Sequence, residues 1–346
     1  MAAGARRAGV SRKTTRVDDF VADILAGPDE LAAALDGHRR RIAALPAGAL
    51  ARPRWRFVGM GSSRYAALDA AAALRAAGLD AAAELPSAST WSAGREDTLV
   101  VAISNSGRTP EVVAAAEHHH GVSYVLGLTG RPESRLAAHC DAVLPLVGRR
   151  AETAGIASLS YRSTVAALQL LAAEAVPALA GTGIAASVPA LETFLRDRVG
   201  WLASAAAMLD AGREVHVLGD GARIGTLEQA ALMLREAPRM EAVAYDTGEW
   251  LHVGLYTQFP GDVALLFGGS LADDEAIATI HARAGVVIAV GPPHADADLH
   301  VPLPDAALTD PALRALVEPA VAELLAAELW RRADARVLRE GPGRRS

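Results

Sequence analysis

The chain has 346 residues and a formal net charge of −6 at pH 7, with 51% hydrophobic and 21% charged residues. A chain of this length is expected to form about two domains with full cores. Its composition excludes an intrinsically disordered protein. The negative net charge excludes the basic field of a nucleic-acid-binding domain, and the basic cluster in residues 6–16 is expected to be a solvated tail.

Cysteine usage and hydropathy bear on the compartment. Cys140 is the only cysteine, so no disulfide can form within the chain, which favours a reducing compartment. The charged N-terminus is not followed by an apolar segment of the kind found in signal peptides. The longest apolar stretch, residues 165–185, contains Glu174 and Pro177 and is expected to form core helices rather than a membrane span. We therefore expect a cytoplasmic protein that binds neither membranes nor nucleic acid.

Two halves of the chain resemble each other. Gly59 and Gly61, at the end of one expected strand, recur as Gly219 and Gly221, 160 residues later. Continuous apolar strands alternate with amphipathic helical patterns in both halves, which predicts parallel sheets covered on both faces. The expected fold is therefore α/β, with two tandem doubly wound parallel-sheet domains and flanking helices. The expected strands are 55–61, 99–103, 123–128, 215–221, 263–267 and 286–290, and the expected helices are 66–77, 111–119, 225–235 and 274–284.

The domain boundaries follow from this repeat. We expect an N-terminal tail and helical extension (1–45), a first domain (46–175), linker helices (176–209), a second domain with a closing helix (210–335) and a tail (336–346). Breaks in the linker region are expected at Pro177, Gly181, Gly183 and Pro189. Pro319 is expected to break the closing helix or to lie in its first turn. The apolar positions after Pro319 need a partner surface.

The loop Ser104-Asn-Ser-Gly-Arg-Thr109 follows a predicted strand and precedes a predicted helix. Thr109 followed by Pro110 is an ordinary helix start, as N-cap and N1. Hydroxyl and amide groups packed just before a helix N-terminus favour, in addition, an anion site. The corresponding loop of the second half, residues 268–274, carries Asp273 and Asp274, which would repel a phosphate. Only the first half is expected to keep the anion site.

Two other sites are not expected. A dinucleotide site at Gly59-Met-Gly61 would need a third glycine where Arg64 stands. His118, His119 and His120 are consecutive on a helix, so their side chains cannot converge on one ion. We therefore expect neither a cofactor nor a metal site.

The Ser104–Thr109 loop, followed by Gly155-Ile-Ala-Ser158, resembles the sugar isomerase (SIS) domain, a flavodoxin-like fold. The resemblance implies that the loop hydroxyls hold a sugar phosphate and that the second segment begins the next helix. Residues 231–252 are similar to the isomerase half of glucosamine-6-phosphate synthases. This similarity implies that Glu236 is the base that moves the sugar C2 proton. It also implies that His252 opens the sugar ring and reaches in from the partner of a homodimer.

The chain departs from that family pattern at several positions. Met233, Arg235 and Ser160 stand where lysines are common, and Val253-Gly254 stands where Gly-Pro is common. Lys13 is the only lysine, so no other residue could form a Schiff base with a substrate carbonyl. Glutamine-dependent aminotransfer is therefore not expected, and no glutamine-hydrolysing domain is expected.

The function expected is an enzyme acting on glucosamine 6-phosphate or N-acetylglucosamine 6-phosphate. With a free C2 amine, proton transfer to C1 gives deamination with isomerisation. With an N-acetyl group, the same intermediate could instead expel the C3 hydroxyl, as a dehydratase would. The rival from another class is a sugar-phosphate sensor without turnover, which would not need Glu236 and His252 together.

The remaining expectations concern single side chains. Arg108 is either a phosphate partner or a solvated charge, Tyr245 and Trp250 are expected in the core, and Glu249 is a candidate to orient His252. The expected substrate-binding residues are Gly61, Ser62, Ser63, Ser104, Asn105, Ser106, Thr109, Ile156 and Ser158.

Overall fold

The computed structural model describes residues 17–146, 152–180 and 183–340. These residues form two five-stranded sheets, ordered β2-β1-β3-β4-β5 and β7-β6-β8-β9-β10. Every strand pair is parallel. When the strands of each sheet are numbered from its own first strand in the chain, both sheets have the order 2-1-3-4-5. This is the order of a doubly wound flavodoxin-like sheet. The predicted pair of parallel α/β sheets is confirmed.

The first sheet buries both faces over its central strands. Trp55 and Phe57 of β1 pack on the side of α3 and α5, whereas Val58 packs on the side of α4. Alternate residues of one strand point to opposite faces, so the continuous apolar run of β3 fills both layers. The elements are β1 (Arg54–Gly59), α3 (Ser62–Ala76), β2 (Asp80–Glu84), β3 (Thr98–Ile103), α4 (Pro110–His119), β4 (Tyr124–Thr129), η1 (Ala137–His139), β5 (Ala142–Pro145) and α5 (Leu159–Ala175).

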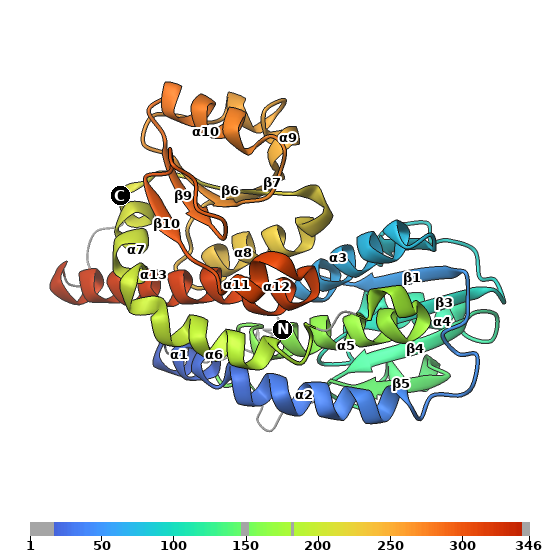
Figure 1. Cartoon of the computed structure of the whole chain (residues 1–346). Helices are drawn as coiled ribbons and strands as arrows, with labels where there is room; N and C mark the ends of the chain where they lie inside the picture. The colour runs from blue at the N-terminus through green and yellow to red at the C-terminus, as the bar shows by residue number, and fades with distance from the viewer. Residues whose placement is uncertain (1–16, 147–151, 181–182, 341–346) are drawn as a thin grey trace, which may run out of the picture.

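The second sheet repeats this plan. Val215 and Val217 of β6 pack toward α8, and Leu218 packs toward α9 and α10 on the opposite face; Figure 1 shows these helices on the two sides of the sheet. The elements are β6 (Val215–Gly219), η4 (Gly221–Arg223), α8 (Ile224–Glu236), β7 (Ala242–Asp246), α9 (Thr247–Trp250), η5 (Gly254–Tyr256), β8 (Val263–Phe267), α10 (Asp273–Ala282), β9 (Val286–Val290) and β10 (Leu299–Val301).

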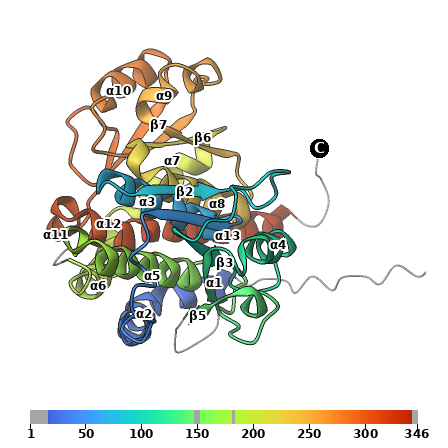
Figure 2. The same ribbon diagram turned by 90° about the vertical axis from the view of Figure 1, so that its right-hand side faces the viewer.

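The inner faces of the two sheets belong to one hydrophobic cluster. Residues of α3, α5, α8 and α13 form the helical layer of this cluster between the sheets, and Figure 2 shows α8 and α13 lying among elements of both halves. The second domain therefore places α8 directly against the first. The remaining helices are α1 (Val17–Leu25), α2 (Gly27–Ile42), η2 (Pro177–Leu179), α6 (Ser187–Asp197), η3 (Arg198–Gly200), α7 (Leu202–Ala211), α11 (Asp305–Thr309), α12 (Pro311–Val317) and α13 (Pro319–Glu340).

Two details of the helices differ from expectation. Pro189 does not break a helix, because it lies in the first turn of α6, where its missing N–H costs no hydrogen bond. The apolar face of the closing helix, including Val321, Leu325 and Leu329, is buried against α1, α7 and α8 of the same chain. It therefore needs no second subunit to cover it. Pro319 begins α13, as predicted.

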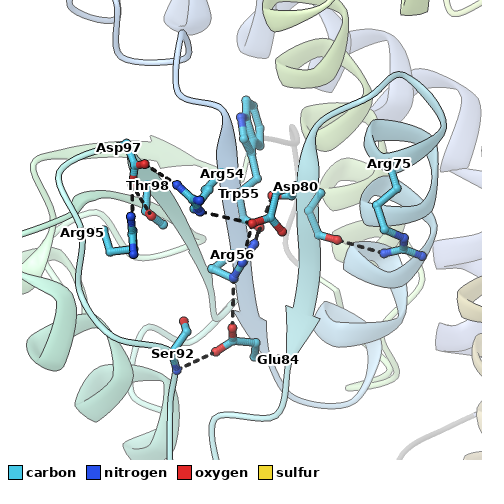
Figure 3. Close-up of polar contacts among 11 residues, drawn as sticks. Arg54, Trp55, Arg56, Arg75, Asp80, Glu84, Ser92, Arg95, Asp97 and Thr98 are labelled. Atoms are coloured by element: carbon cyan, nitrogen blue, oxygen red, sulfur yellow. Dashed lines mark hydrogen bonds and ion pairs between the residues drawn. The ribbon is translucent and has the colours of Figure 1, made fainter.

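The outer face of β2 and of the first half of β1 is charged rather than apolar. Arg56 contacts Asp80 and Glu84 of the edge strand at 3.0 and 3.3 Å, and Arg54 contacts Asp80 at 3.3 Å and also pairs with Asp97 (Figure 3). The connection from β2 to β3, residues 85–97, contains no helix that could cover this face. Charged side chains on an edge strand oppose pairing with another chain. Within the described part of the chain, no helix combines the length and apolar character needed to cross a bilayer.

Candidate active site at the carboxyl edge of the first sheet

Two loops leave the first sheet at its topological switch point. β1 and β3 are neighbours, with Gly59 opposite Ile103, while β2 and β4 continue the sheet in opposite directions. Ligands of doubly wound sheets bind where such loops diverge. Gly61 has a φ of 54°, which favours glycine, and it places Ser62 and Ser63 in the first turn of α3.

The Ser104–Thr109 loop follows β3. Thr109 occupies the N-cap position of α4 but makes no side-chain cap. Its hydroxyl instead lies 2.9 Å from the hydroxyl of buried Ser104, so the amides of the first turn remain uncapped. Asn105 and Ser106 are exposed, and the Ser106 hydroxyl accepts the Arg108 N–H at 3.2 Å. The arrangement retains the donors that an anion would need.

Gly107 allows the two loops at this edge to pack closely. Its φ is 61°, and a Cβ at this position would lie 2.0 Å from Oγ of Ser134. Its N–H donates to the Ser104 carbonyl and its own carbonyl accepts from Leu136. Any larger residue would displace the loop that carries Ser104 and Ser106.

Carboxylates fix the segment before α5. Glu152 accepts the N–H groups of Ser158 and Ser160 at 2.7 and 3.0 Å, and Asp23 of α1 accepts those of Thr153 and Ala154 at 2.9 and 3.0 Å. Further bonds run from the hydroxyls of Thr153 and Ser160.

Ile156 and Ser158 are both buried in this segment. The Ser158 hydroxyl has no hydrogen-bond partner among the described residues. It therefore faces the interior, and the predicted contact of Ser158 with substrate remains a prediction.

The first domain also holds the second domain's helix α8. Asp69 of α3 accepts the N–H groups of Gly225 and Thr226 at 2.7 and 2.9 Å and the Thr226 hydroxyl at 2.7 Å. Gly225 is required there, because a Cβ would lie 2.0 Å from the Tyr65 carbonyl oxygen. One turn further on, the side-chain amide of Gln229 donates to the Ala157 carbonyl at 3.2 Å. These contacts direct α8 toward the carboxyl edge of the first sheet.

Glu236 is the last residue of α8. Its side chain is open to solvent. Partial desolvation of the carboxyl group, and then the charge of Glu152, raise its pKa, against the opposing charge of Arg235. Burial also raises the pKa of Glu152. Glu236 is therefore near enough to interact with the charge of Glu152, which binds Ser158 and Ser160, and its raised pKa is of the kind that suits proton transfer.

His252 lies elsewhere in the chain. It is exposed and follows α9, whose Trp250 is buried and donates its indole N–H to Nδ1 of His216 at 3.1 Å. Because α9 and α8 cover opposite faces of the second sheet, one chain does not bring His252 to Glu236 (Figure 1). Glu249 contacts His252 through the backbone, its carbonyl accepting the His252 N–H at 3.0 Å.

The equivalent edge of the second sheet is occupied by a carboxylate of the chain itself. Asp273 accepts the N–H groups of Gly269 and Ser270 at 2.7 and 3.0 Å, and burial raises its pKa. Nearby, Arg223 and Arg314 both form ion pairs with the buried Glu318. The amides that might hold a phosphate here already have an anionic partner.

The positions that depart from the family's lysines have other contacts. Met233 is fully buried, Arg235 faces Glu228 at 3.7 Å, and Ser160 bonds to Glu152. Lys13 lies outside the described residues. Trp250 is in the core, as predicted. Among the described residues, no three His, Cys, Asp or Glu side chains are placed to share a metal ion.

Sequence reasoning missed Glu152, Asp69 and Asp23. Their partners are far away along the chain; Asp69 and Thr226, for example, are separated by 157 residues. A carboxylate six residues before Ser158, next to a predicted helix start, was the available signal for Glu152.

Comparison with known proteins adds the family. The profile of the SIS domain matches residues 51–174, which contain the Ser104–Thr109 loop and the start of α5. Residues 51–174 form a SIS domain. A search of the curated proteins finds no match to the chain.

Solved structures resemble the whole chain, SIS domain and second domain together. The C-terminal domain of glucosamine-fructose-6-phosphate aminotransferase from Francisella tularensis aligns with a TM-score of 0.74 at 16% identity, over 94% of this chain and 98% of that one. Tagatose-6-phosphate ketose/aldose isomerase from Escherichia coli gives a TM-score of 0.76 at 16% identity, over 94% of each chain. Glucosamine-6-phosphate deaminase from Thermotoga maritima gives 0.69 at 19% identity, over 91% of this chain and 94% of that one. At these identities the likeness concerns the fold.

Proposed function

We propose that the protein is a sugar-phosphate enzyme of the isomerase type, acting on an amino-sugar 6-phosphate with Glu236 as the base at C2. The observation that carries the proposal is the position of Glu236. The second domain contributes this carboxylate, with a raised pKa, on a helix that the SIS domain holds through Asp69 and Ala157.

The roles follow from the chemistry of the groups. The hydroxyls and amides of the Ser104–Thr109 loop, with Ser62 and Ser63, bind the phosphate as charge-assisted donors. Glu236 removes the C2 proton of the open-chain sugar, and the proton returns at C1. A C2 amine then leaves as ammonia after hydrolysis of the imine. The similarity in fold to a glucosamine-6-phosphate deaminase and to a tagatose-6-phosphate ketose/aldose isomerase supports a sugar phosphate as the substrate.

We further propose that His252 acts across a homodimer. It is exposed and is flanked by Val253, Tyr256 and Phe259, whose exposed fractions are 48%, 76% and 49%. Exposed apolar side chains grouped in this way fit a surface covered by a partner. Because His252 does not reach the Glu236 of its own chain, its proposed role requires the partner's active site.

The proposal is tested by incubation with glucosamine 6-phosphate or N-acetylglucosamine 6-phosphate in deuterated water, with NMR of the C2 proton. We expect exchange of that proton, because removal of it begins every reaction considered. Ammonia release would then identify deamination, and an unsaturated product would identify dehydration at C3. Tight binding of both sugars without exchange would contradict the proposal and favour a sensor.

A further inference from the structure

A cavity opens beside the Ser104–Thr109 loop, between the connections that follow β3 and β4. Its volume is ≈ 640 Å³, which lies within the range of small-molecule binding sites. The proposed reaction uses the Ser104–Thr109 loop, which forms one wall of the cavity, but assigns no role to the opposite wall, residues 130–134. The lining residues of the cavity are Ser106, Arg108, Gly130, Arg131, Pro132, Glu133 and Ser134.

The two walls of the cavity are joined beneath it. The Asn105 carbonyl accepts the Gly130 N–H at 3.0 Å, and the Gly107 carbonyl accepts the Leu136 N–H at 3.1 Å. The Thr129 hydroxyl accepts the Arg131 N–H at 3.1 Å. Because these hydrogen bonds hold both walls in place before a ligand binds, little free energy is lost in ordering the two loops on binding.

The cavity is rich in donors that lack protein partners. Within the described part of the chain, neither Arg108 nor Arg131 forms an ion pair, in contrast to the buried Arg162, which pairs with Glu323 at 2.8 Å. The Ser134 hydroxyl, by contrast, is shielded from solvent and packs against Gly107, so it is not available to a ligand in the cavity. The Ser106 oxygen accepts a backbone N–H, which leaves its own proton free to donate.

Glu133 is the one carboxylate in the lining. Two guanidinium groups against one carboxylate leave a positive excess, and guanidinium groups match the oxygens of phosphoryl groups with paired hydrogen bonds. The Glu133 carboxylate can accept a hydrogen bond from a hydroxyl or amine group on the same ligand. The chemistry therefore fits a phosphorylated small molecule with a neighbouring hydroxyl.

We propose that this cavity is a second anion site, which binds a phosphorylated small molecule between Arg108 and Arg131. It shares Ser106 and Arg108 with the sugar-phosphate loop, but the Ser104 and Thr109 hydroxyls of that loop face each other and do not line the cavity. Ser106 belongs to both sites, so occupancy of one alters the affinity of the other by linkage.

The test uses pyrophosphate as the probe in titration calorimetry. The Ser104→Ala/Thr109→Val variant removes both hydroxyls of the bonded pair, so that neither is left buried without its hydrogen-bond partner. We expect pyrophosphate to bind this variant within about twofold of the wild type, since the cavity donors remain. Adding Arg131→Gln should weaken binding by about 10- to 100-fold.

Arg135→Gln is the matched control, since Arg135 is exposed on the same segment but does not line the cavity. Circular dichroism establishes that each variant is folded. Loss of pyrophosphate binding in Ser104→Ala/Thr109→Val would show that the sugar-phosphate loop is the only anion site, and would overturn the proposal. An Arg131→Gln effect no larger than that of Arg135→Gln would also overturn it. Neither result depends on whether the protein turns over a sugar.

Discussion

At the scale of single residues, the Ser104–Thr109 loop places hydroxyls and uncapped first-turn amides at the carboxyl edge of the first sheet. The phosphate loop was predicted from residue types and position, and Ser104 to Thr109 lie where a switch-point ligand would bind. The pairing of the Ser104 and Thr109 hydroxyls at 2.9 Å and the interior position of Ser158 depend on side-chain orientation. Neither residue composition nor residue spacing predicts side-chain orientation.

Substitution of Ser106 by Ala together with Thr109 by Val tests the loop. We expect weaker binding of glucosamine 6-phosphate, because each lost charge-assisted hydrogen bond costs about 1.5–3 kcal/mol. Calorimetry measures the affinity. Ser270→Ala, in the equivalent loop that Asp273 fills, is the matched control and should bind as the wild type does. Unchanged affinity in the double variant would move the phosphate site elsewhere.

At the scale of elements, the continuous apolar strands β1, β3, β4, β6, β8 and β9 were predicted, together with the helices between them. The strands missed lie toward the sheet edges. β2 reads Asp-Ala-Ala-Ala-Glu, and β7, β10 and β5 are similarly short or partly exposed. The apolar runs in these segments are short or consist mostly of alanine, and pairing with a neighbouring strand makes the segments extended.

The contact that sets α8 against the SIS domain is also tertiary. Asp69 caps α8 from another domain, and no local pattern indicates this. Burial raises the pKa of Asp69 to about 6 from 3.8, against hydrogen bonds from Thr226 and Gly225. Because the pKa is higher in the folded state, protonation of Asp69 stabilises the folded protein. This stabilisation is complete below pH 3.8, the ordinary pKa of the group, and is lost as the pH rises through about 6.

Asp69→Ala should therefore destabilise the protein in a pH-dependent way. At pH 7 we expect a loss of about 1–3 kcal/mol in the free energy of unfolding, from the lost helix cap. At pH 5 the loss should be about 1 kcal/mol larger, because the wild type then gains from the raised pKa. Urea denaturation at both pH values measures it. Asp36→Ala, at an exposed surface pair with Arg39, is the control and should change stability by less than about 0.5 kcal/mol. An Asp69→Ala loss equal at both pH values would contradict the raised pKa.

At the scale of the whole molecule, one core joins the two sheets. The sequence predicted the duplication, and it also predicted that the apolar face of the closing helix needs a partner surface, which a second subunit could have supplied. The structure covers that helix within the chain, so the case for a homodimer now rests on His252 and the apolar side chains around it.

Mixing two inactive variants tests the shared site. Glu236→Gln and His252→Asn chains, refolded together, should regain about a quarter of wild-type activity, since one site in each mixed dimer keeps both residues. Each variant refolded alone is the control and should stay inactive. Mixed dimers, observed by native mass spectrometry, without regained activity would contradict a shared site.

The central claim, that Glu236 removes the C2 proton, is tested most directly by the rate of C2 proton exchange in Glu236→Gln. Glu228→Gln is the matched control, because Glu228 is partly exposed on the same helix and contacts Arg235. Loss of a general base should slow exchange by about two to four orders of magnitude in Glu236→Gln, while Glu228→Gln exchanges at nearly the wild-type rate and both variants bind the sugar phosphate. Exchange in Glu236→Gln at the wild-type rate would contradict the claim.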